Sequence, residues 1–169
     1  RVTVVLPTAL SVTGLGLRLL RNAARYRWLR RTGRPGTPLA VSIEVTQRCI
    51  AHCVMCGIWR APAVSDMALE RWLALLSDPL LADLRELDIT GGEPFLRDDL
   101  PNLVDGVARL KGSRLYRLRS VAITTNGLLT DHVVAGTERM AAALATAGLD
   151  LIVVCALDAV GPLHDEIRA

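Results

Sequence analysis

The chain has 169 residues, of which 51% are hydrophobic and 4% aromatic, and its formal net charge is +3. The first 40 residues hold eight arginines and no acidic residue, whereas the remainder holds 12 basic and 17 acidic side chains. The size and composition predict a domain with a sizeable core, and the acidic, aromatic-poor body argues against nucleic-acid binding.

The basic N-terminal segment allows two interpretations. Val2 to Leu17 carries no charge, but it is shorter than the roughly 20 residues that a spanning helix needs, and a signal peptide is weakly supported. The stretch "RLLRNAARYRWLRRTGR" that follows is typical either of a basic helix lying on an anionic membrane or of a helix packed outside the body with its arginines in water. The second interpretation is favoured.

A Gly/Pro-rich break, "TGRPGTP" at 32–38, predicts a domain boundary. We therefore expect a basic, helical N-terminal segment over residues 1–38 and a main domain over residues 39–169.

Strand and helix patterns alternate after the break. The predicted strands cover 40–46, 84–90, 120–125 and 149–157, and the predicted helices cover 66–78, 99–111 and 131–147. Such alternation predicts an α/β fold with a parallel sheet. The expected helix N-caps are Asp66, Asp98 or Asp99, and Thr130, and the expected helix ends are Gly112 and Gly148.

The predicted strands carry polar residues on one face. Ser42, Glu44 and Thr46 alternate with apolar residues in the first strand, and Asp88 and Thr90 do so in the second. A sheet buried on both faces reads instead as continuous apolar runs. The alternation favours a βα barrel with a polar interior, in which chemistry takes place at the C-terminal ends of the strands.

Three of the four cysteines, Cys49, Cys53 and Cys56, follow the first strand with the spacing C-x3-C-x2-C. An odd cluster cannot pair internally, and the four cysteines do not form a secreted disulfide framework. A zinc site lacks a second ligand pair, and a thioredoxin-like pair leaves Cys49 without a role. An iron–sulfur cluster uses all three. Cys155 is expected to face the helices as a small buried residue, which leaves one iron without a protein ligand.

"CIAHCVMC" resembles the cluster motif of the radical S-adenosylmethionine (radical SAM) enzymes. The resemblance extends to "GGEPFLR", "TTNGLLT" and "ALDAVGPLHDEIR", which follow the second, third and fourth predicted strands, and it covers about residues 39–168. It implies a partial radical SAM (β/α)6 TIM-like barrel with four of its six parallel strands present and a helical lead.

The resemblance also implies roles for individual residues. Cys49, Cys53 and Cys56 would ligate a [4Fe-4S] cluster, whose open iron binds the methionine part of SAM. The implied SAM contacts lie after all four strands, and they are Met55, Gly91, Gly92, Glu93, Asn126 and Asp158. No catalytic residue is expected beyond the cluster.

The implied reaction begins with one-electron reduction of the cluster by a flavodoxin or ferredoxin. Reductive cleavage of SAM then gives a 5′-deoxyadenosyl radical, which abstracts hydrogen from a peptide, lipid or other small-molecule substrate. We expect a cytoplasmic protein with peripheral membrane contact through the N-terminal arginines as an option. The alternative is a non-catalytic iron–sulfur or zinc-binding redox or scaffold module.

Three features depart from the family pattern. Ile50 replaces the usual Asn after the first cysteine, and the fourth strand ends Ala156-Leu157-Asp158-Ala159 in place of S-L-D-G, so a hydroxyl near the ribose is missing. The chain also holds four of six expected strands, which indicates a piece of a longer protein.

Overall fold

The computed structural model describes residues 12–34, 36–62 and 64–168, and the chain divides into two compact units, Arg1–Gly36 and Thr37–Ala169. The division falls inside the Gly/Pro-rich segment 32–38. Residues 1–11, which include most of the uncharged stretch that begins at Val2, lie outside the described residues.

In the first unit, the arginine-rich stretch forms helix α1 (Val12–Thr32). Two arginines in its last turn lie where positive charge offsets the negative end of the helix dipole. Leu17 and Leu20 are 70% and 71% exposed, and the Arg34 guanidinium lies 5.6 Å from the centre of the Trp28 ring. Among the described residues, no helix has the length and apolar character to cross a bilayer.

The second unit is built on a parallel sheet with the strand order β1-β2-β3-β4. The strands are β1 (Ala40–Thr46), β2 (Glu86–Gly91), β3 (Ser120–Thr125) and β4 (Asp150–Cys155). The connections contain α2 (Leu69–Leu76), α3 (Leu100–Lys111) and α4 (Thr130–Thr146), and β4 leads into α5 (Pro162–Arg168). Short 3-10 helices η1 (Ile58–Arg60), η2 (Pro79–Leu81) and η3 (Pro94–Leu96) complete the order. The predicted α/β fold with four parallel strands is confirmed.

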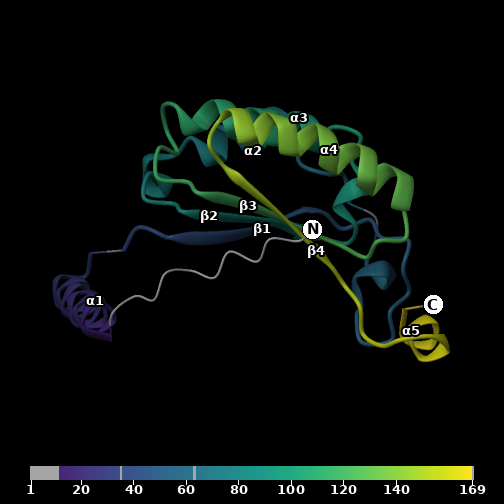
Figure 1. Cartoon of the computed structure of the whole chain (residues 1–169), viewed down its shortest axis with the longest axis horizontal. Helices are drawn as coiled ribbons and strands as arrows, with labels where there is room; N and C mark the ends of the chain where they lie inside the picture. Colours follow the sequence, from purple (N-terminus) through teal and green to yellow (C-terminus); the bar gives the residue numbers. More distant parts are fainter. Residues whose placement is uncertain (1–11, 35, 63, 169) are drawn as a thin grey trace. The chain divides into compact units, whose positions relative to one another are not determined.

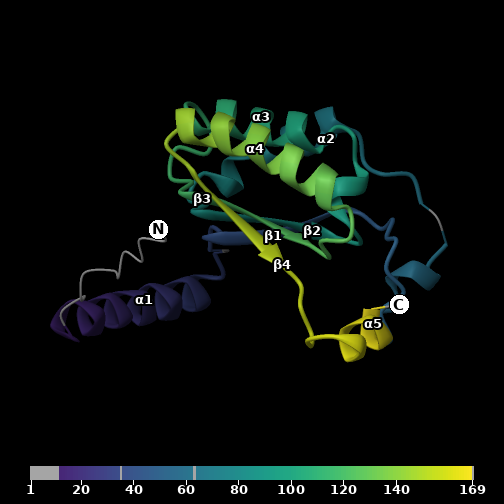
Figure 2. The ribbon, with the colours of Figure 1, turned by 45° about the vertical axis from the view of Figure 1, so that its right-hand side comes forward.

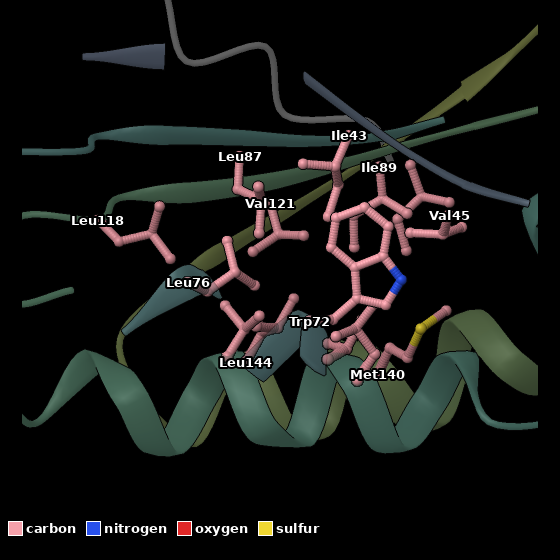
Figure 3. Close-up of a cluster of buried hydrophobic side chains, with 14 of the residues drawn as sticks. Ile43, Val45, Trp72, Leu76, Leu87, Ile89, Leu118, Val121, Met140 and Leu144 are labelled. Atoms are coloured by element: carbon pink, nitrogen blue, oxygen red, sulfur yellow. The ribbon is translucent and has the colours of Figure 1, made fainter. Parts of the chain in front are cut away.

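The two faces of the sheet differ in what covers them. Helices α2, α3 and α4 lie on one face (Figures 1 and 2). Apolar strand residues point from this face toward Trp72, Leu76, Met140 and Leu144 of the helices (Figure 3). These strand residues are Ile43, Val45, Leu87, Ile89, Val121 and Ile123, all 6% exposed or less.

The other face carries the polar row that the sequence alternation predicts. Ser42 and Glu44 are exposed, and the Ser42 hydroxyl donates to the Asp88 carboxylate at 2.8 Å across the β1–β2 pair. Thr46 is an exception, because it is buried at 3% exposure. The register of the β1–β2 pair shifts between Glu44 and Thr46. Because of this irregularity, Thr46 does not follow the alternation of exposed and buried side chains along β1.

The helix ends agree with the predictions better than the helix starts. Gly112 is the C-cap of α3, and Gly148 follows α4 with φ of 68°. Helix α2 begins at Leu69, later than the expected cap Asp66, whose carboxylate instead binds Arg48 at 2.8 Å. Asp99 does occupy the N-cap position of α3, but its side chain caps no backbone N–H.

Candidate functional site

The three clustered cysteines lie in the loop that leaves the C-terminal end of β1. Cys53 is 7% exposed, Cys49 is half-buried and Cys56 is exposed, and all three are free thiols. The Cys53 carbonyl accepts both the Cys56 backbone N–H at 3.0 Å and the Trp59 indole N–H at 3.3 Å. These two bonds fold residues 53–59 back on themselves.

A cavity of about 280 Å³ lies where the strands end, and all three cysteines line it. The other lining residues come from the C-terminal ends of β2 and β3 and from the segments that follow the four strands. They include Met55, Gly91, Gly92, Thr124, Asn126, Ala156, Asp158 and Arg168. Four segments spread across the sequence therefore meet on one cavity.

Two glycines allow the segment after β2 to lie directly against the cysteine loop. The N–H of Gly92 donates to the Thr46 carbonyl at 2.9 Å. A Cβ atom on Gly91 would lie 2.2 Å from the Thr46 carbonyl oxygen, and one on Gly92 would lie 2.2 Å from the Arg48 carbonyl oxygen. Gly91 also has φ of 135°, which L side chains rarely adopt. The cavity wall at this point is consequently bare backbone.

Glu93 lies behind this wall and is not among the residues that line the cavity. Its side chain is fully buried, and its carboxylate accepts the backbone N–H groups of Phe95 at 3.1 Å and Asn126 at 2.8 Å. The Thr125 hydroxyl lies 2.9 and 3.0 Å from the two carboxylate oxygens. A buried carboxylate is tolerated when donors satisfy it, and here those donors join the end of β2 to the end of β3.

Arg97, the last residue of the "GGEPFLR" segment, is a second buried charged residue here. It is 5% exposed, and it donates to the carbonyls of Val45 at 2.8 Å and Met67 at 3.1 Å. It also donates to the Asp99 carboxylate at 2.7 Å, and this hydrogen bond is the main reason why the pKa of Asp99 lies below its ordinary value. Arg97 thus holds the end of β1 to the segment that precedes α2.

Polar side chains approach two of the cysteine sulfurs. The Asn126 amide nitrogen lies 3.8 Å from Cys49 Sγ, and the Arg168 Nη1 lies 3.8 Å from Cys53 Sγ. The Arg168 Nε binds the Asp158 carboxylate at 2.5 Å. Burial lowers the pKa of Arg168, but the Asp158 hydrogen bond and the charges of Cys53 and Asp158 outweigh it and raise that pKa overall.

The comparisons with known proteins agree with this geometry. The model of the radical SAM superfamily matches residues 43–168. The chain belongs to the radical SAM superfamily. It is 34% identical over 91 residues to the GTP 3′,8-cyclase of Pelotomaculum thermopropionicum, a match that covers 52% of this chain and 26% of that protein. It is 33% identical over 116 residues to the PqqA peptide cyclase of Rhodopseudomonas palustris, covering 68% of this chain and 27% of that protein.

Solved radical SAM structures share the fold. Streptococcus suis SuiB bound to S-adenosylmethionine superposes with a TM-score of 0.59 at 21% identity, covering 90% of this chain and 33% of that one. SuiB bound to the precursor peptide SuiA gives 0.62 at 19% identity, covering 99% and 35%. The chain therefore spans about a third or less of the length of these relatives.

The donor set of the cavity suits the cofactors that radical SAM enzymes use, a [4Fe-4S] cluster and SAM. In the described part of the chain, no three His, Cys, Asp or Glu side chains converge as they would on a single metal ion. The thiols of Cys49, Cys53 and Cys56 instead surround one cavity, and each thiolate of a cubane binds its own iron. Gly91 and Gly92 line the same cavity beside them.

Cys155 lies apart from this donor set. It does not line the cavity, and its Sγ lies against Gly127, where an added Cβ would come within 2.9 Å of the sulfur. Its side chain is exposed, so the expectation of a buried residue is wrong. Strand β4 lies at the edge of the sheet and pairs with β3. Its side chains are therefore more exposed than those of β2 and β3.

Proposed function

We propose that this chain carries the cluster- and SAM-binding part of a radical SAM enzyme, with Cys49, Cys53 and Cys56 as the ligands of a [4Fe-4S] cluster. The observation that carries the proposal is the cavity at the strand ends, which all three cysteines line together with the segments after β2, β3 and β4. This part corresponds to residues 39–169, with residues 1–38 as a separate basic lead.

Residues around the cavity would hold SAM beside the cluster. Gly91 and Gly92 line the cavity without side chains of their own, so their backbone carbonyl groups would bind the ammonium of the methionine part. Asn126 and Asp158 supply polar groups for the ribose or the substrate, and Met55 supplies an apolar surface for the adenine. When bound, the cluster supplies the electron for reductive cleavage of SAM, which leads to hydrogen abstraction from the substrate.

Glu93 contributes to the same site in a different manner from the glycines. Its carboxylate already accepts three donors inside the protein, so it is not free to turn toward the cavity without leaving them unsatisfied. We propose that the negative charge of Glu93 stabilises the ammonium group of SAM from behind the cavity wall. Its hydrogen bonds to the backbone N–H groups of Phe95 and Asn126 also keep the neighbouring backbone in position.

We propose a peptide or a small molecule as the substrate. The named activities of the relatives, PqqA peptide cyclase and GTP 3′,8-cyclase, represent these two classes. The polar open face of the sheet, with Ser42, Glu44 and Asp88, offers hydrogen bonds to either. The proposed reductant is a flavodoxin or ferredoxin in the cytoplasm, and the arginines of α1 are the proposed contact if the protein binds a membrane surface.

Anaerobic reconstitution with iron and sulfide, followed by dithionite and SAM, tests the proposal. We expect a brown protein that produces 5′-deoxyadenosine. Cys53→Ala is expected to abolish both properties, because it removes one of three cluster ligands, whereas Cys155→Ala is the matched control and is expected to retain them. Iron content and chromatographic detection of 5′-deoxyadenosine give the two readings.

Two outcomes would contradict the proposal in different ways. A protein that loads and reduces a cluster but leaves SAM intact is a non-catalytic redox module. A colourless protein with stoichiometric zinc is a structural metal protein.

A further inference from the structure

We infer that Arg168 raises the reduction potential of the cluster by donating an N–H group to the sulfur of Cys53. The inference rests on the proposed function. Arg168 lines the cysteine cavity with its Nη1 atom 3.8 Å from Cys53 Sγ, and both side chains are largely shielded from water, at 16% exposure for Arg168 and 7% for the whole of Cys53.

The guanidinium is held in place from two directions. Its Nε binds Asp158 at 2.5 Å, which leaves Nη1 directed at the cysteine loop. The backbone of α5 is tied to the same loop, because the Val54 N–H donates to the Ile167 carbonyl at 2.9 Å. Little side-chain freedom is then lost when the contact to sulfur forms.

The three cysteines differ in the donors that reach them. Cys49 Sγ is approached by the neutral amide of Asn126, and Cys53 Sγ by the cationic guanidinium of Arg168. Cys56 is exposed, and no side-chain donor in the described residues is bonded to its sulfur. The charged contact is therefore confined to the thiolate that is most shielded from water.

Donation to a ligating sulfur withdraws negative charge from it. Reduction adds one electron to the cluster, so a donor at the sulfur stabilises the reduced state more than the oxidised state and raises the potential. Because Asp158 neutralises the formal charge of Arg168, the effect depends on the N–H contact as well as on charge. The electron still comes from the external one-electron carrier, and no proton transfer is required.

The test measures the midpoint potential of the reconstituted cluster by anaerobic spectroscopic titration without SAM. Arg168→Met removes the donor and leaves the Asp158 charge uncompensated, so we expect the largest shift to a more negative potential. The double variant Asp158→Asn with Arg168→Met removes the donor while the formal charge of the pair stays unchanged. We expect its potential to be less negative than that of Arg168→Met but still below wild type.

Two further variants serve as controls. Arg139 also pairs with a carboxylate, that of Asp105 at 3.1 Å, but between α4 and α3, so Arg139→Met is expected to leave the potential unchanged. Arg168→Lys keeps a cationic donor, but its single nitrogen cannot serve both Asp158 and Cys53. We expect its potential between wild type and Arg168→Met, and it provides a reading if the Met variant fails to load.

The outcomes separate this inference from the proposed function. Equal potentials in loaded wild type and all Arg168 variants would overturn the inference alone. A double variant at the wild-type potential would also overturn it, because the Asp158 charge would then account for any shift in the single variant. Failure of the wild-type protein to load a cluster would overturn the proposed function, and the inference with it.

Discussion

The covered face of the sheet and the C-terminal ends of its strands are held together by different forces. Between the sheet and helices α2, α3 and α4, apolar side chains fill the space (Figure 3). At the strand ends, the buried charges of Glu93 and Arg97 and the close backbone contacts of Gly92 connect the segments. The stability of the covered face depends on side chains of the right volume, whereas the strand ends depend on individual hydrogen bonds and backbone contacts. The same kind of substitution is therefore expected to have different effects in the two regions.

The largest effect is expected when a glycine at the strand ends is replaced by alanine. Gly92→Ala places a Cβ 2.2 Å from the Arg48 carbonyl oxygen and 3.0 Å from Cys49 Cβ, so the cysteine loop must move. We expect a cost above the about 1–3 kcal/mol typical of overpacking and loss of most cluster loading. Iron content after reconstitution measures the effect. At Gly112, the nearest atom to an added Cβ is 3.7 Å away, so Gly112→Ala is expected to load normally; equal loss in both variants would contradict the argument.

A core substitution is expected to change stability without changing the site. Leu76 is fully buried, and Leu76→Ala should lower the free energy of unfolding by about 2–5 kcal/mol while the folded fraction still loads its cluster. Urea denaturation of the apoprotein gives the first value and iron per folded protein the second. Leu75 in the same helix is 49% exposed, so Leu75→Ala should cost about 0.5 kcal/mol or less. A loading defect specific to Leu76→Ala would show that the two regions are not independent.

Glu93→Gln tests the buried carboxylate with little change of shape. One oxygen becomes an amide N–H₂ that faces donors, so we expect a loss of about 1–3 kcal/mol and weaker SAM binding by the loaded protein. Denaturation and calorimetric titration with SAM measure the two effects. Glu86→Gln, at the exposed opposite end of β2, is the control and should change neither. Unaltered SAM affinity in a destabilised Glu93→Gln protein would limit Glu93 to a purely structural role.

The smallest effect is expected at Asp99. Its pKa is lowered from 3.8 by the Arg97 hydrogen bond, so the folded state favours the carboxylate. The resulting stabilisation is present above the ordinary pKa and is lost as the pH falls below that value through the lower folded pKa. Asp99→Asn should remove this contribution from the acid dependence of the free energy of unfolding. The contribution is expected to be less than about 1 kcal/mol, because the carboxylate is 37% exposed. The free energy of unfolding measured across this pH range checks the prediction, and an unchanged acid dependence in Asp99→Asn would contradict it.

The sequence predicted the covered region well because its signals are local. Alternating residues such as Val41 to Val45 and apolar helix positions follow the periods of strands and helices, and the strands formed close to where they were predicted. The four motif segments were also placed correctly at the strand ends, since the C-terminal ends of parallel strands share one edge.

The details of the site depend on partners that are distant in sequence. Asp66 and Asp99 read as helix caps, but Arg48 and Arg97 bind their carboxylates. Thr125, which binds Glu93, lies at the end of β3, whereas Glu93 follows β2. No sequence pattern predicts this pairing. Arg97 and Arg168 are the last residues of the motif segments "GGEPFLR" and "ALDAVGPLHDEIR", but nothing in the sequence shows which partners they bind before the fold is known.

The bond between the loop after β1 and helix α5 also bears on the order of biosynthesis. The Arg168 and Cys53 side chains that meet here are 115 positions apart, so this contact closes late and at a higher cost in chain entropy than the neighbouring strand pairs. During translation, the Cys53 thiol emerges long before the helix that contacts it. Iron delivery is therefore expected to follow completion of the fourth β/α unit, and the Cys53 sulfur is expected to be open to oxidants until then.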